Sequence, residues 1–203
     1  MRKMWKRIVL CACITGCLWT WGLLTDRQTL RDEIMRLHVV ADSDSAEDQA
    51  IKLRVRDAVL ETISEDLKNV ADMDQARAYI RENLPKIQKA ANDCLEALGC
   101  QDRAVAVLQE EVFDTRYYDT FSLPAGIYEA LRITIGSGEG QNWWCVAFPT
   151  LCTPATAEGF EEAAVSAGFS ETLTETLEGE YELRFYFLDL LGRLEGILRK
   201  QGN

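Results

Sequence analysis

The stretch from His38 to Leu60, "HVVADSDSAEDQAIKLRVRDAVL", decides the first half of the fold because a strand pattern and a helix pattern meet within it. Residues 33–41, "EIMRLHVVA", are apolar with β-branched side chains, which is typical of a β-strand. Residues 45–67 carry an amphipathic helix pattern instead. The predicted inward face of this helix consists of Ile51, Val55, Ala58, Val59 and Ile63.

Four polar residues separate the two patterns: Asp42, Ser43, Asp44 and Ser45. Their side chains can accept hydrogen bonds from the free backbone amides of the first helical turn, and the acids lie near the positive end of the helix dipole. Asp44 with Glu47, or Ser45 with Asp48, offers the capping pair. We therefore expect this segment to start the helix.

A calcium site is the alternative interpretation of the same segment. Asp42 and Asp44 begin like a calcium loop, but Glu47 occupies the position of the usual glycine and Leu53 that of the bidentate glutamate. We predict neither a metal nor another cofactor. A calcium-dependent envelope or adhesion module stays open as an alternative function.

The remaining patterns predict an α+β fold, an antiparallel sheet with packed amphipathic helices. A second helix is expected over residues 74–98, with a kink or a break at Pro85. Strands are expected at residues 103–113, after a turn at Pro124–Gly126, and at residues 142–148. "SGEG" before the last strand reads as a hairpin loop. The inward positions of the second helix are Ala76, Ile80, Leu84, Ile87, Ala91 and Leu95.

Helix patterns return toward the C-terminus. "TAEGFEEAAVSAG", residues 156–168, predicts one helix, and "YELRFYFLDLLGRLEGILR", residues 181–199, predicts a closing helix, although its first seven residues also fit a strand. We expect three parts: residues 1–25 as signal peptide or membrane anchor, residues 26–153 as the α+β domain, and residues 154–203 as a helical extension.

The N-terminus has the composition of an export segment. Four basic residues within "MRKMWKR" precede 17 uncharged, mostly apolar residues, Ile8–Leu24. Basic flanks stay in the cytoplasm, so the rest of the chain is expected outside it. Cleavage, retention as an anchor, and lipidation at Cys17 all stay open; a retained segment would contact the membrane through residues 8–24. The chain has a net charge of −11 despite these bases, which makes nucleic acid an improbable partner.

Four cysteines lie beyond the export segment, where they can be oxidised. Cys145 and Cys152 enclose "VAFPTL", whose proline suits a bend, and we predict that they form a disulfide. Cys94 and Cys100 are a possible second pair. Zinc is the rival ligand, but no C-x-x-C spacing occurs.

The sequence shows no active site. The only histidine, His38, lies on a predicted strand, and neither a G-x-S-x-G nor an H-E-x-x-H motif occurs. An extracytoplasmic cysteine hydrolase using His38 with Cys145 or Cys152 is the enzymatic alternative. Trp143 and Trp144 are adjacent on a strand and so face opposite sides, which makes one of them a candidate contact anchor.

Two stretches carry a resemblance to a known family. Residues 36–60, "RLHVVADSDSAEDQAIKLRVRDAVL", and residues 123–152, "LPAGIYEALRITIGSGEGQNWWCVAFPTLC", resemble the two signature blocks of the stage II sporulation protein R family of endospore-forming bacteria. The resemblance extends over residues 34–152. The chain departs from the family at Asp42, where asparagine is usual, and at Thr150, where a second proline is frequent.

The resemblance implies a signalling protein and not an enzyme. Family members are exported from the forespore into the space between the two sporulation membranes. There they activate a membrane-embedded aspartic protease of the mother cell, which removes the pro-sequence of sigma E. On this basis we expect the segment Asp42–Ser45 together with Trp143 and Trp144 to contribute to the surface that contacts the protease.

Overall fold

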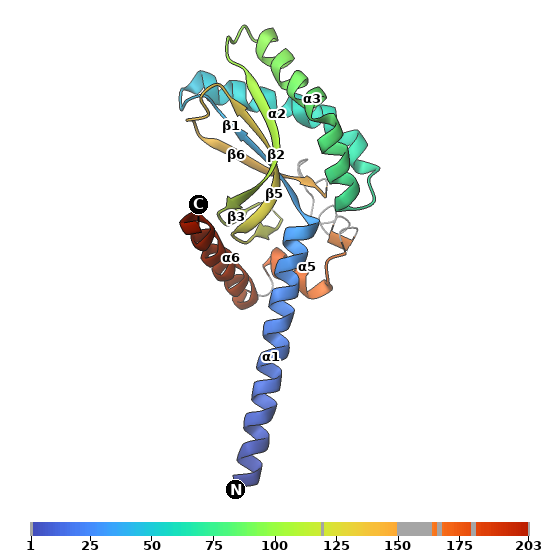
Figure 1. Ribbon diagram of the computed structural model, residues 1–203, viewed down its shortest axis with the longest axis vertical. Coiled ribbons are helices and arrows are strands. Elements are labelled where there is room, and N and C mark those ends of the chain that lie inside the picture. Colours follow the sequence, from blue (N-terminus) through green and yellow to red (C-terminus); the bar gives the residue numbers. More distant parts are fainter. Residues whose placement is uncertain (1, 119, 150–163, 166–167, 180–181, 203) are drawn as a thin grey trace.

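One long helix, α1 (Arg2–Glu33), carries the apolar N-terminal segment and continues into the folded body (Figure 1). The structure is a computed structural model that describes residues 2–118, 120–149, 164–165, 168–179 and 182–202. The most apolar 18-residue window of α1 has a mean hydropathy of 1.8, so the helix is long and apolar enough to cross a membrane or to serve as a signal sequence. Its burial within the body begins at Leu23 and continues at Asp26 and Leu30.

The main sheet contains β1 (Met35–Val40), β2 (Ala104–Phe113), β5 (Gly126–Ile135) and β6 (Asn142–Phe148), in the order β2-β5-β1-β6. The α+β fold class is confirmed. The β2–β5 and β1–β6 pairs are antiparallel, as expected, but β1 runs parallel to β5. The sheet is therefore mixed.

The expected hairpin between β5 and β6 is wrong, because β1 lies between these two strands. The connection, residues 136–141, crosses the end of β1 instead of reversing the chain onto a neighbour. Two strand spacings amount to about 10 Å, which six residues span easily. A short loop between two strands thus does not prove that they pair.

The helices α2 (Ala46–Lys68) and α3 (Met73–Ala97) cover one face of the sheet (Figure 1). Their predicted inward faces are buried there, apart from the partly exposed Ile51, Ala58 and Leu84. The expected break at Pro85 is absent from α3, which continues through it. Pro85 and Arg81 are both exposed, so water can replace the amide that the carbonyl of Arg81 lacks.

The opposite face packs against a second apolar cluster. The end of α1, the short strand β4 (Ser122–Leu123), and the helices α5 (Glu171–Glu178) and α6 (Glu182–Gly202) contribute to it. Strand β4 pairs with a second short strand, β3 (Arg116–Tyr117). Arg36 of β1 is fully buried on this face, where its guanidinium lies 4.3 Å from the ring centre of Phe113 and donates to Tyr118 Oη at 2.8 Å. Burial lowers the pKa of Arg36.

The alternative strand at the start of the closing segment is wrong, since α6 is helical from Glu182 onward. The helix packs closely because two of its residues are glycine. A Cβ at Gly192 would overlap the carbonyl of Ala125, and one at Gly196 would crowd Val112. The predicted helix at residues 156–168 falls mostly outside the described residues.

The glycine contact gives a prediction for stability. Gly192→Ala should push α6 away from Ala125 and lower the free energy of unfolding by about 1 to 3 kcal/mol, as overpacking generally does. Leu194→Ala, on the exposed side of the same helix, is the matched control and should have a small effect. Thermal unfolding of both variants in one detergent makes the comparison. Equal melting temperatures would show that the close packing of α6 is unimportant.

Candidate functional site

The candidate site is formed by two loops at one end of the sheet, residues 41–45 after β1 and residues 136–141 after β5, here called the distal loops. Since β1 starts directly after α1 and runs away from it, the distal loops lie at the end of the sheet opposite α1 (Figure 1). The two loops belong to segments nearly one hundred residues apart in the sequence. Their contacts are therefore long-range and specify the fold.

Asp42 makes the first link between the loops. Its Oδ1 accepts a hydrogen bond from the backbone N–H of Ser137 at 2.6 Å, and its carbonyl accepts from Ser137 Oγ at 3.0 Å and from the N–H of Glu139 at 3.1 Å. These hydrogen bonds from Ser137, first the backbone and then the side chain, lower the pKa of Asp42. Its carboxylate thus replaces the partner that the Ser137 amide would have in a hairpin.

Two glycines allow the loops to approach each other. Gly136 has a φ of +56°, which favours glycine, and a Cβ there would overlap the carboxylate of Asp42. A Cβ at Gly140 would overlap the backbone carbonyl of Ser43, while the Gly140 N–H donates to the carbonyl of Ala41 at 3.0 Å. Glycine at positions 136 and 140 therefore allows the two loops to be in contact.

The helix start follows one of the two predicted capping pairs. Ser45 is the N-cap of α2, and its Oγ accepts from the N–H of Asp48 at 3.0 Å and donates to Asp48 Oδ2 at 2.8 Å. Asp44 instead accepts from the N–H of Gln141 at 2.7 Å. Asp44 thus joins the loops, and Ser45 caps the helix.

Lys52 of α2 connects the two distal loops through hydrogen bonds. Its ammonium group donates to the carbonyl of Gln141 at 2.9 Å and to Gln49 Oε1 at 2.5 Å, while Gln49 Nε2 donates to the carbonyl of Ser43 at 2.9 Å. Lys52 is buried, and this burial lowers its pKa. Sequence patterns do not reveal this role, since Lys52 simply occupies one position of a charged helix.

Trp143 and Trp144 lie on opposite faces of β6, as their alternation predicts. Trp143 packs on the α2 side beneath Arg56, whose guanidinium lies 4.7 Å from its ring centre. Trp144 packs on the other side, 3.5 Å from the guanidinium of Arg116. Both indoles are half-buried. Each is thus partly covered by an arginine, with some surface left for a partner.

His38 is buried next to Trp144 and uses both ring nitrogens. Nδ1 lies 2.6 Å from Glu111 Oε2, Nε2 lies 2.8 Å from Asn142 Oδ1, and the ring stacks on Trp144 at 5.6 Å between centres. Burial alone would raise the pKa of Glu111, but hydrogen bonds from His38, Gln109 and Arg132 together lower it to about 2. This arrangement holds the strands together.

The cysteine pairing expected for a hydrolase does not fit the sheet geometry. Cys145 lies opposite Leu37 in the β1–β6 register and packs with it on the α2 and α3 side, whereas His38 lies opposite Trp144 on the other face. The side chains of Cys145 and His38 are thus separated by the sheet. Cys152, the other candidate nucleophile, lies outside the described residues.

The possible second disulfide is not formed in the structure, in which Cys94 and Cys100 are free thiols. Cys94 packs in the last turns of α3 near Arg54 of α2, and burial raises its pKa. Cys100 follows the helix end and donates to Asp102 Oδ2 at 3.4 Å. The two thiols therefore have different neighbours, although they are only six residues apart.

Comparison with known proteins supports the resemblance seen in the sequence. The family model described as Stage II sporulation protein R matches residues 31–158. The chain belongs to this family. Stage II sporulation protein R of Bacillus subtilis (strain 168) is 40% identical over 121 residues, which cover 60% of this chain and 54% of that relative. No solved structure matches the chain.

The sporulation protein R match contains the main sheet, α2, α3 and the distal loops. The two stretches that carry the resemblance, residues 36–60 and 123–152, meet in these loops, through Asp42 with Ser137 and Asp44 with Gln141. Most of α1 and all of α5 and α6 lie outside the matched residues.

A pair of substitutions tests the link through Asp42. Asp42→Ala removes the acceptor of the Ser137 amide and should lower the melting temperature, because the amide loses its partner. Asp42→Asn keeps a side-chain oxygen at the same place and should melt close to the parent protein. Differential scanning calorimetry at pH 7 distinguishes them; an alanine variant as stable as the asparagine variant would contradict the assignment.

The low pKa of Glu111 predicts a pH dependence of stability. The folded protein binds this proton less tightly than the unfolded chain, so the stabilisation is present above pH 4.5 and is lost as the pH falls toward 2. The loss should be on the order of 2 to 3 kcal/mol. Urea unfolding between pH 2 and 5 should show a shallower dependence for Glu111→Gln than for Glu61→Gln, an exposed control. Identical slopes would refute the prediction.

The disulfide between Cys145 and Cys152 stays a prediction. Cys145 is buried on β6, and closing a loop of about eight residues should contribute roughly 2 to 3 kcal/mol, mainly through the unfolded state. Mass spectrometry of non-reduced peptides from protein purified without reductant should find the two cysteines linked. Alkylation of both thiols without prior reduction would rule the bridge out.

Proposed function

We propose that this chain is an exported sporulation signal that activates a membrane-embedded aspartic protease, which then removes the pro-sequence of sigma E in the mother cell. It would act in the space between forespore and mother cell, either secreted or held by α1. Membership of the sporulation protein R family supports the sporulation role, and the apolar helix α1 supports export.

The proposal rests on one observation, the position at which the two stretches that resemble the family meet. The distal loops combine both stretches at the end of the sheet opposite α1. If α1 is anchored in the forespore membrane, from which the chain is exported, these loops point across the intermembrane space toward the mother-cell membrane. A surface in this position can bind a partner that lies in the mother-cell membrane.

The surface around the distal loops has features of a recognition site. Asp44 and Ser45 are exposed, Asp42 and Ser43 partly so, and Trp143 adds a half-buried aromatic ring at the start of β6. Glu47 and Glu139 add exposed negative charge, which suits a basic partner. The loops are fixed by the Asp42 and Asp44 hydrogen bonds, so binding orders little additional chain.

Activation requires no chemistry by this chain. A partner that binds the distal loops more tightly in its active or dimeric state than in its inactive state is shifted toward activity by that difference in affinity. The engagement of His38 by Glu111 and Asn142, on the face away from Cys145, supports a binding role over hydrolysis.

Co-expression tests the proposal directly. The full chain, the candidate protease and the pro-sigma substrate are produced in a non-sporulating host, and removal of the pro-sequence is followed by immunoblot. Cleavage is expected only when all three proteins are present, and it should disappear when the catalytic aspartate of the protease is replaced. Equal cleavage without this chain, or no cleavage despite its export, would contradict the proposal.

Charge reversal at the distal loops refines the same assay. Glu139→Lys places a positive charge on the exposed loop while the backbone amide of residue 139 keeps its bond to Asp42, so the fold should persist and activation should fall. Like charges at an interface cost enough to reduce binding about 10-fold or more. Glu61→Lys, an equal change on the exposed side of α2, should retain activity. If Glu61→Lys reduced activation more than Glu139→Lys did, the contact with the protease would lie elsewhere.

A further inference from the structure

Helix α6 exposes an apolar face that the fold leaves uncovered. The face opposite Gly192 and Gly196 carries large side chains at helical spacing, and all of them are exposed. An exposed apolar stripe of this size marks an interaction surface. The exposed residues are Leu183, Tyr186, Leu190, Leu194, Ile197 and Leu198.

The start of α6 lies beside the apolar segment of α1. The rings of Trp19 and Phe187 meet edge to face, with 5.1 Å between their centres. Arg184 forms an ion pair with Asp26, which is buried, and its guanidinium also lies beside Gly22. The first turns of α6 are therefore at the level of the last turns of the apolar segment.

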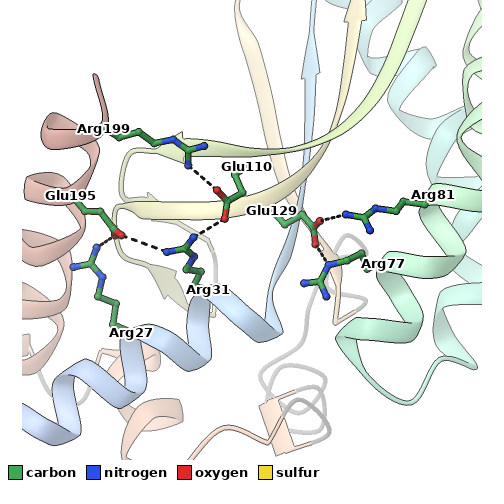
Figure 2. A network of polar contacts seen from close by, with 8 residues as sticks. All are labelled: Arg27, Arg31, Arg77, Arg81, Glu110, Glu129, Glu195 and Arg199. Atoms are coloured by element: carbon green, nitrogen blue, oxygen red, sulfur yellow. Dashed lines mark hydrogen bonds and ion pairs between the residues drawn. The ribbon is translucent and has the colours of Figure 1, made fainter. Parts of the chain in front are cut away.

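A chain of ion pairs holds α6 in this position (Figure 2). Glu195 of α6 pairs with Arg27 and Arg31 of α1, and Arg31 and Arg199 both pair with Glu110 of β2. Glu129 of β5, which lies opposite Glu110 in the β2–β5 register, pairs with two arginines of α3. Helix α6 is thus connected to both α1 and the sheet, and it stays beside α1 wherever α1 lies.

The length of the apolar segment places α6 at the bilayer. The 17 residues Ile8–Leu24 form about 25 Å of helix, less than the roughly 30 Å of a hydrocarbon core. When an apolar segment is shorter than the hydrocarbon core, the protein surface next to that segment is drawn toward the membrane. On the α6 side, that surface includes Leu183, Tyr186 and Phe187. Aromatic side chains are favoured at this depth.

We propose that the outer face of the first half of α6, with Leu183, Tyr186 and Leu190, binds the lipid surface of the membrane that α1 spans. Glu182 is exposed at the first turn of α6. The two later acids, Asp189 and Glu195, turn toward Thr115 and toward α1, so the outer face beyond the first turn bears no negative charge that anionic lipids would repel. A tilt of α1 of about 20° lays further leucines of the stripe on the surface.

The consequence is a body with a fixed orientation. A single membrane helix leaves a domain free to lean in any direction, whereas two contacts on one side restrict it. The distal loops are then held at the far end of the body. This inference requires α1 to be retained, and it does not depend on activation of any protease.

Photo-crosslinking in lipid vesicles tests the proposal with the full chain. The photoreactive residue p-benzoylphenylalanine replaces Tyr186, a near match in shape, in protein reconstituted into vesicles of phosphatidylglycerol and phosphatidylethanolamine. The same residue at Leu18, exposed on α1, reports insertion of the helix. At Leu98, exposed at the end of α3, it reports nonspecific labelling. Circular dichroism melts confirm that each variant is folded.

We expect lipid adducts at positions 18 and 186 and none at position 98, as read by mass spectrometry of the peptides. Adducts at 18 without adducts at 186 would overturn the proposal, and so would crosslinks from 186 to a second copy of the chain. Absence of adducts at 18 would also overturn it, because α1 would then not span the bilayer. A parallel probe at Leu190 must give the same result as Tyr186.

Discussion

The placement of β1 between β5 and β6 is the constraint on which the rest of the structure depends. All six residues of β1 are buried. Met35, Leu37 and Val39 face α2 and α3, while the side chains of Arg36 and His38 face the second cluster. Because α1 ends just before β1 and α2 begins just after it, this strand fixes the apolar helix α1 at one end of the sheet and the distal loops at the other. It also separates β5 from β6, so their connection must cross the end of β1.

The crossing connection between β5 and β6 obtains its hydrogen-bond partners within the distal loops. A connection that does not close a hairpin leaves backbone amides without strand partners, and such amides bond to water unless the protein supplies an acceptor. Asp42 and Asp44 accept from two of these amides, those of Ser137 and Gln141, and glycine at positions 136 and 140 provides the space. The acidic segment is thus first a structural device, and the surface that we propose for partner binding is rigid for the same reason.

Periodicity and composition predict the strands, the two long helices and the closing helix, because their buried faces repeat at the spacing of each element. They do not predict strand order, since a six-residue loop fits a hairpin and a crossing equally well. At the site, the capping role of Ser45 follows from its position, whereas the support by Lys52 and the His38–Glu111 pair depend on residues brought together by the sheet. The outward face of α6 is visible as a pattern, but only the contacts with Trp19 and Asp26 relate it to the membrane.

The central claim is that the distal loops signal from one membrane to a protease in another. The most direct measurement reconstitutes the anchored full chain in one vesicle population and the protease with its pro-sigma substrate in a second, each with its exported side outward, and follows cleavage after mixing. The account predicts cleavage between vesicles that Glu139→Lys in the chain reduces and Glu61→Lys does not. Cleavage only when both proteins share one vesicle, or equal cleavage with both variants, would contradict it.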